Sequence, residues 1–274
     1  MGEFLNRIKT LGRGGLGVVS LYQTTEGQVA VKQMLNSWDS TLRERFHREI
    51  QIMASLVHKN IVKILNYNIS QAEPWYTMKY YKDGSLRDQI KKLAELGKIY
   101  NQSAAASIIY FLADAMSHAH ANNIIHRDLK PENILFENEE PKIADWGIGR
   151  FIHHQSKVLT NEGIGTKIYC APEQWQSGNA DQRSDIYSLG IIFRELLTGL
   201  THGTISDPIL NNIVTKMTAL SPDDRYQSMY EVMQAIQTLE IVNTENPMQA
   251  FWEGAAKVAI TAGLAWLLIN ALSD

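Results

Sequence analysis

The first part of the chain consists of short apolar, β-branched runs separated by turn-forming residues. Residues 16–22 and 29–33 are two such runs, and residues 25–27 between them read Thr-Glu-Gly. β-Branched runs bounded by turn residues are typical of strands, so this pattern predicts a β-hairpin. We expect residues 1–78 to form short strands around one helix.

The helix in this region is predicted to run from Ser40, as its cap, to about Val57. Its apolar stripe is Leu42, Phe46, Ile50, Met53 and Val57. Glu49 falls within the stripe, three residues after Phe46. A carboxylate on a buried face needs a partner, because burying it unpaired costs several kcal/mol. Lys32 is the candidate partner, and a half-exposed glutamate is the alternative.

Beyond residue 78 the apolar spacing becomes helical. It is clearest from about Asn101 to Asn123, where residues at helical spacing are Ile108, Leu112, Ala115, Met116 and Ala119. This spacing predicts a helix over about residues 101–123.

The end of the chain has a different pattern. Residues 241–250 look like a linker, and the run 255–272 carries only one charge, on Lys257. About 18 apolar residues is the short end of what crosses a bilayer as a helix. The pattern favours a hydrophobic C-terminal helix within 251–274 that anchors the chain in a membrane. The alternatives are an interfacial helix and a soluble helix that packs on the chain or forms a homodimer.

Composition narrows the partners and the compartment. A formal charge of −3 gives no electrostatic case for nucleic acid. The single cysteine, Cys170, excludes an internal disulfide and fits a reducing cytoplasm, where a small packing role is expected for it. The first residues lack the basic and apolar regions of a signal peptide.

Chemistry-bearing residues are concentrated in segment 126–133, His-Arg-Asp-Leu-Lys-Pro-Glu-Asn, which Asp145 follows twelve residues later. Asp128 can take or orient the proton of an attacking hydroxyl, and Lys130 can neutralise charge on a moving phosphoryl group. Asn133 and Asp145 are oxygen donors of the kind that Mg²⁺ prefers. This spacing predicts phosphoryl transfer from Mg-ATP.

A glycine-rich turn, residues 12–17, lies just before the predicted hairpin. Glycine lacks a Cβ atom, so such a backbone can lie close to phosphates and offer its N–H groups. Most glycine-rich turns are simply tight turns, but the strand Ala30-Val31-Lys32 that follows favours phosphate binding.

Together these segments resemble the eukaryotic-type (Hanks-type) Ser/Thr protein kinases, whose motifs appear in family order. The motifs are Gly-x-Gly-x-x-Gly-x-Val at 12–19, Val-Ala-Val-Lys at 29–32, Ala-Pro-Glu at 171–173 and Asp-Ile-Tyr-Ser-Leu-Gly at 185–190. Arg225 is placed to pair with Glu173. The resemblance covers roughly residues 1–240, and the brevity of the chain is similar to that of prokaryotic or phage members.

The resemblance implies a two-lobed α+β fold, with a β-rich N-lobe of about residues 1–78 and an α-helical C-lobe of about residues 79–240. It implies ATP and Mg²⁺ as cofactors and Asn133 and Asp145 as the metal ligands. The implied catalytic residues are Asp128, Lys130 and Thr166. The implied ATP-binding residues are Leu11, Gly12, Gly14, Gly17, Val19, Ala30, Lys32, Glu49, Met78 and Tyr80, with the Lys32–Glu49 pair holding the phosphates.

The resemblance also bears on the substrate. Lys130 and the segment 165–173 are similar to the Ser/Thr-specific branch, which implies transfer to Ser or Thr hydroxyls of proteins, including the chain itself. Arg127, directly before the catalytic aspartate, implies an activation segment that phosphorylation orders. Ser156 and Thr160 are the candidate sites, and ordinary solvated hydroxyls are the alternative.

Two departures from the family pattern keep other functions open. Trp146 replaces the usual phenylalanine, and only residues 200–208 join Gly199 to the next predicted helix, so a helix that often docks substrates is expected to be reduced or missing. A nucleotide-binding pseudokinase is therefore one alternative, and a Tyr or dual-specificity kinase is another. A small-molecule kinase is disfavoured by Ala-Pro-Glu at 171–173 and by Arg225.

Overall fold

The fold was analysed in a computed structural model, which describes residues 4–70, 72–146, 168–176 and 180–239. The strands are β1 (Phe4–Gly14), β2 (Gly17–Thr24), β3 (Gly27–Met34), β4 (Ile64–Asn68), β5 (Trp75–Lys79), β6 (Ile134–Glu137) and β7 (Glu140–Ile143). The helices are α1 (Ser40–Ser55), α2 (Leu86–Glu95), α3 (Gln102–Ala121), α5 (Pro172–Gln176), α6 (Gln182–Thr198), α7 (Pro208–Met217) and α8 (Met229–Gln237). Short 3₁₀ turns span Pro131–Asn133 and Pro222–Asp224.

The predicted hairpin is part of a five-stranded antiparallel sheet with strand order β1-β2-β3-β5-β4. It is formed by β2 and β3, and Thr25 and Glu26 make its two-residue turn, because Thr24 pairs directly with Gly27. Gly27 has φ of 123°, a conformation that glycine adopts without the steric cost of a side chain. The turn chemistry visible in the sequence thus sets the register of the strands that carry the site.

The cap predicted for α1 is wrong by one residue. Asp39, and not Ser40, is the N-cap, and its side chain accepts hydrogen bonds from the backbone N–H groups of Thr41 and Leu42 at 2.9 and 3.0 Å. A carboxylate caps a helix as well as a hydroxyl does and also suits the positive end of the helix dipole.

The predicted end of α1 is wrong as well. The helix ends at Ser55, and Leu56 has an extended backbone with φ of −90° and ψ of 113°. This bend buries Leu56 in the core, while Val57 is 78% exposed and does not belong to the apolar stripe.

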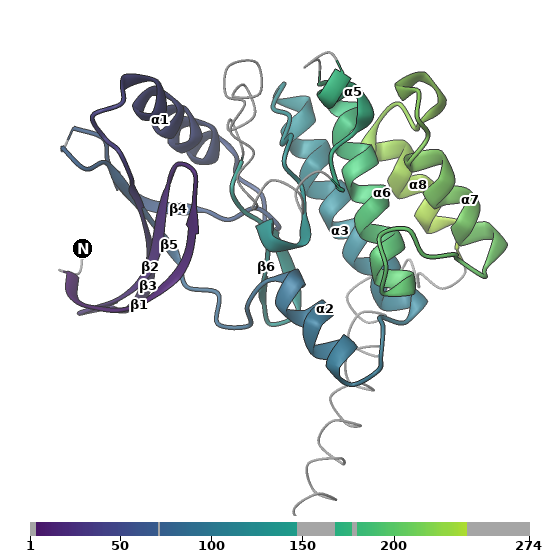
Figure 1. The fold of residues 1–274 in the computed structure, drawn as a ribbon, viewed down its shortest axis with the longest axis horizontal. Coiled ribbons are helices and arrows are strands. Elements are labelled where there is room, and N and C mark those ends of the chain that lie inside the picture. The colour runs from purple at the N-terminus through teal and green to yellow at the C-terminus, as the bar shows by residue number, and fades with distance from the viewer. Residues whose placement is uncertain (1–3, 71, 147–167, 177–179, 240–274) are drawn as a thin grey trace, which may run out of the picture.

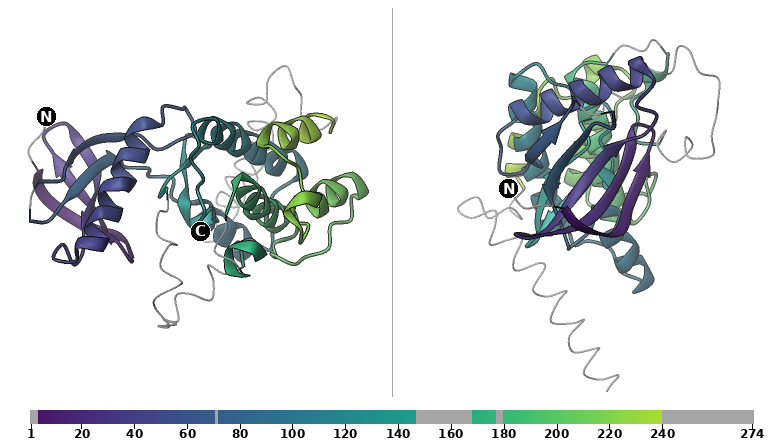
Figure 2. Two further views of the ribbon diagram at one scale, coloured as in Figure 1. Left: turned by 90° about the horizontal axis from the view of Figure 1, so that it is seen from above. Right: turned by 90° about the vertical axis from the view of Figure 1, so that its left-hand side faces the viewer.

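Helices α3, α6, α7 and α8 form the second lobe, at the opposite end of the molecule from the five-stranded sheet and α1 (Figures 1 and 2). The predicted helix 101–123 is α3, and Asn101 caps it by accepting from the N–H of Ala104 at 2.8 Å. α3 is its centre, because it contacts α6, α8 and β7 and is buried over most of its length. The two-lobed α+β architecture is therefore confirmed.

Strands β6 and β7 form a separate hairpin between the lobes (Figure 1). The carbonyl of Ile143 accepts a hydrogen bond from the N–H of Val62, which follows α1, at 2.9 Å, and Ile143 also forms a bridge with Ile61. The hairpin therefore carries the start of the Asp145 segment to the boundary of the two lobes.

The connection between α6 and α7 is as short as the sequence predicts. Gly199 ends α6 in the left-handed conformation, with φ of 74°, and α7 begins at Pro208 with Asp207 as its cap. All residues between them are described, and they form no helix. The part of the chain that the structure describes also contains no helix long and apolar enough to cross a membrane. The predicted linker 241–250 and the C-terminal helix within 251–274 lie outside it.

Candidate active site

One cleft of about 1210 Å³ collects the predicted site residues. Its lining includes every predicted catalytic, ATP-binding and metal-binding residue except Thr166, which lies outside the described residues together with Ser156 and Thr160. The lining comes from the glycine-rich turn, β2, β3, α1, β5, the β5–α2 connection and α2. It also includes residues of the predicted catalytic loop (residues 126–133), the residues after β7, residues 168–169 and Glu195 of α6. Sequence positions more than 100 residues apart therefore meet in a single concave site.

The glycines that line the cleft are explained by two different physical causes. A Cβ atom on Gly17 would lie 2.4 Å from the carbonyl oxygen of Gln33, so the pairing of β2 with β3 requires glycine there. A Cβ atom on Gly12, Gly14 or Gly15 would meet no described residue within 4 Å. Within the described part of the chain no contact demands glycine at these three positions, and the bare backbone leaves room for a ligand to approach closely.

The predicted ion pair between Lys32 and Glu49 is present. Lys32 Nζ lies 2.6 Å from Glu49 Oε1, and both side chains are buried. Tyr76, opposite Lys32 in the sheet, donates from its hydroxyl to the same carboxylate oxygen at 2.8 Å. The buried carboxylate on the apolar stripe of α1 thus has hydrogen-bonding partners, as the spacing of Glu49 indicated.

Lys32 also reaches the second lobe. Its Nζ lies 2.5 Å from Asp145 Oδ1. Burial by itself would lower the pKa of Lys32, but the carboxylates of Asp145 and Glu49 raise this pKa well above its ordinary value. Burial would raise the pKa of Asp145, but the charge of Lys32 lowers it overall, so Asp145 is ionised at neutral pH. One ammonium group therefore joins α1, β3 and the segment after β7.

The catalytic-loop residues lie within contact of one another. Lys130 Nζ is 2.9 Å from Asp128 Oδ2. The Asn133 amide nitrogen donates to the Asp128 backbone carbonyl at 2.9 Å and lies 3.4 Å from Asp128 Oδ2. The carbonyl of Asn133 in turn accepts from the N–H of Ala144 at 2.8 Å, which brings the residue before Asp145 next to Asn133. Asn133 and Asp145, whose side-chain oxygens suit a divalent cation, thus lie close to each other in the chain's fold beside Asp128.

A buried carboxylate holds the catalytic loop in place. Asp185, in the first turn of α6, is fully buried and accepts from the backbone N–H groups of His126 and Arg127 at 2.9 and 2.8 Å. The ring of His120 lies 2.9 Å from the same side chain. Arg127 has φ of 67°, which is costly for a residue with a side chain. The paired hydrogen bonds to Asp185 stabilise this conformation directly before Asp128.

Trp146 is buried behind the cleft. It is 1% exposed, and its indole ring lies against His126 with the ring centroids 4.9 Å apart. Among the described residues its Nε1 finds no hydrogen-bond acceptor. The unusual tryptophan therefore fills space next to the catalytic loop and leaves one buried donor unsatisfied.

The segment joining the two lobes closes the back of the cleft. Met78 is buried on β5 opposite Ala30, and Tyr80, two residues later, lines the cleft. Lys79, between them, forms an ion pair with Glu137 of β6. The chain passes from the sheet to the helices along this wall, and residues 78–82 line the cleft.

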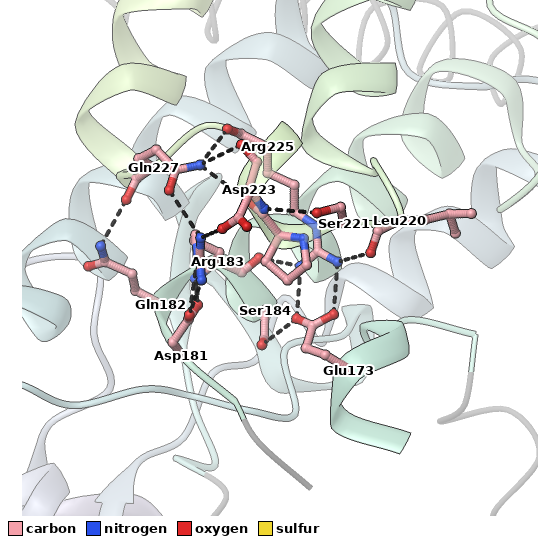
Figure 3. Close-up of polar contacts among 11 residues, drawn as sticks. Glu173, Asp181, Gln182, Arg183, Ser184, Leu220, Ser221, Asp223, Arg225 and Gln227 are labelled. Carbon is pink, nitrogen blue, oxygen red and sulfur yellow. Dashed lines mark hydrogen bonds and ion pairs between the residues drawn. The ribbon is translucent and has the colours of Figure 1, made fainter. Parts of the chain in front are cut away.

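Glu173 and Arg225 form the predicted pair. The guanidinium of Arg225 donates to both carboxylate oxygens of Glu173 at 2.8 Å, and Ser184 donates to Glu173 at 2.7 Å (Figure 3). Arg225 also donates to the backbone carbonyls of Ala219, Arg183 and Leu220. The start of α5 is thereby tied to the base of α6 and to the turn before α8.

A third buried carboxylate, Glu195, and its partners were not predicted from the sequence. Glu195 of α6 accepts from Arg87 Nη1 at 2.7 Å and from the hydroxyl of Tyr169 at 2.5 Å. Glu195 follows Ile191 and Ile192 of the buried face by four and three residues, which is the same signal that identified Glu49. No equivalent signal marks Arg87, because an arginine in the first turn of a helix is ordinarily solvated.

Fold and site together define a phosphoryl-transfer protein with a nucleotide cleft between a β-rich and a helical lobe. The chain belongs to the protein kinase family, whose protein kinase domain model matches residues 5–243. It is 33% identical to the probable serine/threonine-protein kinase PknB of Lactococcus lactis over 84% of this chain, and 31% identical to the serine/threonine-protein kinase PrkC of Bacillus subtilis over 84%. Both relatives are named as serine/threonine-protein kinases.

The similarity extends over only part of the length of these relatives. The chain spans 41% of the length of PknB and 40% of that of PrkC. Among solved structures, the Mycobacterium tuberculosis PknI kinase domain superimposes with a TM-score of 0.66, covering 86% of this chain and 96% of that one. The two sequences are 23% identical, so this likeness bears on the fold alone.

Proposed function

We propose that the chain is an ATP-dependent kinase that transfers the γ-phosphate to Ser and Thr hydroxyls of proteins, including its own. The observation that carries the proposal is the joint presence, in one cleft, of the Lys32–Glu49–Asp145 cluster and the Asp128–Lys130–Asn133 group. Phosphoryl transfer is catalysed mainly by positioning and charge stabilisation, and these residues supply both.

In this proposal each group has one task. Lys32, held by Glu49, contacts the phosphates of ATP under the glycine-rich turn. Asp128 orients the acceptor hydroxyl and takes its proton, while Lys130 offsets negative charge on the transferred group. Asn133 and Asp145 would hold Mg²⁺, whose positive charge would offset the negative charge of the phosphates.

The metal assignment rests on the chemistry of two donors. Asn133 commits its amide nitrogen to Asp128, so its side-chain oxygen is the atom left for a cation. The lowered pKa of Asp145 keeps that carboxylate charged. An amide oxygen with a carboxylate oxygen fits a hard cation such as Mg²⁺.

The experiment that tests this function is labelling of a generic protein with γ-labelled ATP, in Mg²⁺ or in excess EDTA, followed by phosphoamino-acid analysis. We expect label on Ser and Thr in Mg²⁺ and none above background in EDTA. Label on tyrosine would favour the Tyr or dual-specificity alternative, and equal labelling in EDTA would contradict the metal assignment.

We also propose that the run 255–272 tethers the chain to a membrane, with the kinase lobes in the cytoplasm. Its length and its single charge support this. In fractionated cells the full chain should sediment with membranes, and a chain ending at residue 250 should stay in the supernatant. A full chain that stays in the supernatant as a dimer would support the soluble-helix alternative instead.

A further inference from the structure

The guanidinium of Arg87 links four parts of the chain on the side of the cleft near Asp128. Arg87, in the first turn of α2, donates from Nε to Glu132 of the catalytic loop at 2.7 Å and from Nη1 to Glu195 of α6 at 2.7 Å. Its Nη2 donates to the hydroxyl of Tyr169, which precedes α5, at 2.5 Å. The Arg87 side chain is 19% exposed, and that of Glu195 is 8% exposed.

The hydrogen bonds of Arg87 restrict the geometry of its partners. Tyr169 donates to the same Glu195 carboxylate that Arg87 binds, at 2.5 Å, and the carbonyl of Tyr169 accepts from Ser188 of α6 at 2.7 Å. Charge-assisted hydrogen bonds of this kind are about twice as strong as neutral ones, and the planar guanidinium allows few other geometries. Tyr169 is therefore held to α6 at its backbone and at its hydroxyl.

This network borders the part of the cleft that remains for the acceptor. The nucleotide-binding residues come from β1–β3, α1 and the β5–α2 connection, whereas Arg87, Glu132, Tyr169 and Glu195 line the cleft from the helical lobe. An acceptor hydroxyl must reach Asp128 from the side that ATP does not fill. Glu132 lies four residues after Asp128, so its attachment to Arg87 also restrains the loop that carries Asp128.

We propose, on the basis of the proposed kinase function, that Arg87 is a positioning residue for the protein substrate. By binding Glu132 and Tyr169 at once, it sets the distance between Asp128 and the wall formed by residues 168–169. The guanidinium of Arg87 is committed to Glu132, Glu195 and the hydroxyl of Tyr169, so Arg87 acts through these residues. With the connection after Gly199 too short to form a docking helix, this wall carries much of the substrate alignment.

The test measures initial rates for the full chain and its Arg87→Met variant, varying a protein substrate and ATP separately. The KM for the protein substrate should rise about tenfold in Arg87→Met, equivalent to about 1.4 kcal/mol. The KM for ATP and the slow hydrolysis of ATP without substrate should stay within about twofold of the wild type. Arg87→Lys should recover part of the loss, because an ammonium group cannot bind all three partners in the same geometry.

Two further variants separate positioning from folding. Tyr169→Phe removes the hydroxyl but keeps the ring, and it should raise the same KM by a smaller factor. Arg194→Met is the matched control, since Arg194 lies on α6 next to Glu195 but binds Thr218 and does not line the cleft. Its two KM values and its rate of ATP hydrolysis should match those of the wild type.

Unchanged substrate KM in Arg87→Met would overturn the inference, and so would a uniform loss in which ATP KM, ATP hydrolysis and melting temperature all change together. A wild-type chain that transfers no phosphate would overturn the proposed function and this inference with it. An active wild type with an unaffected Arg87→Met variant overturns this inference alone.

Discussion

Replacing Asp128 by asparagine is expected to lower kcat for phosphate transfer by about 10²–10⁴-fold, the usual contribution of a positioned general base. Asparagine keeps the size of the side chain and can still meet Lys130, which lies 2.9 Å from the aspartate. It cannot take the proton of the acceptor hydroxyl. The measurement is a steady-state rate at saturating ATP and protein substrate, with ATP affinity measured separately by titration.

The affinity for ATP should change little, because the nucleotide contacts proposed for Lys32 and the glycine-rich turn are untouched. Asp114→Asn provides a matched control on α3, where Asp114 pairs with His58 and does not line the cleft. A variant Asp128→Asn with a wild-type kcat would show that Asp128 does not act as the base.

Replacing Arg225 by methionine is expected to lower the free energy of unfolding by about 3–5 kcal/mol, as breaking a buried ion pair does. The Arg225 side chain is fully buried, and its loss leaves the Glu173 carboxylate with Ser184 alone among the partners shown in Figure 3. Three backbone carbonyls lose their donor as well. Urea denaturation of the full chain measures the change.

Arg183→Met is the control for this prediction. Arg183 is a neighbouring arginine with two carboxylate partners, but Asp181 and Asp223 are 50% and 85% exposed. Exposed pairs contribute about 0–1 kcal/mol, so this variant should lose far less stability. Equal losses in the two variants would contradict the buried-pair account.

The same pair predicts a pH dependence. Burial would raise the pKa of Glu173, but the hydrogen bonds from Arg225 and Ser184 lower it below its ordinary value of 4.5. The stabilisation is therefore complete above pH 4.5 and is lost as the pH falls through the lower pKa of the folded state. The difference in stability between the wild type and Arg225→Met should shrink over that acidic range.

The sequence predicts most of what is local or strongly patterned. The hairpin around Thr25 and Glu26 follows from β-branched runs and turn residues. The need for a partner at Glu49 follows from the cost of burying a carboxylate on an apolar stripe, and the choice of Lys32 follows from the Val-Ala-Val-Lys motif. The pairing of Arg225 with Glu173 follows from the family resemblance. These features depend on few residues with narrow chemical requirements.

The features that the sequence does not predict depend on which of several suitable residues reaches a given place in the folded chain. Asp39 and Ser40 are both good caps, and only the path of the chain decides between them. The end of α1 depends on whether Leu56 or Val57 reaches the core. The link from Arg87 to Glu195 joins residues 108 positions apart, and no local pattern relates them.

The measurement that tests the central claim most directly is phosphate incorporation by the purified chain with Mg-ATP and a generic protein, read by mass spectrometry. The wild type should gain phosphate on Ser or Thr, and the Lys32→Met and Asp128→Asn variants should gain far less in the same time. A wild type that binds ATP but transfers no phosphate would contradict the account, and the chain would then be a nucleotide-binding pseudokinase.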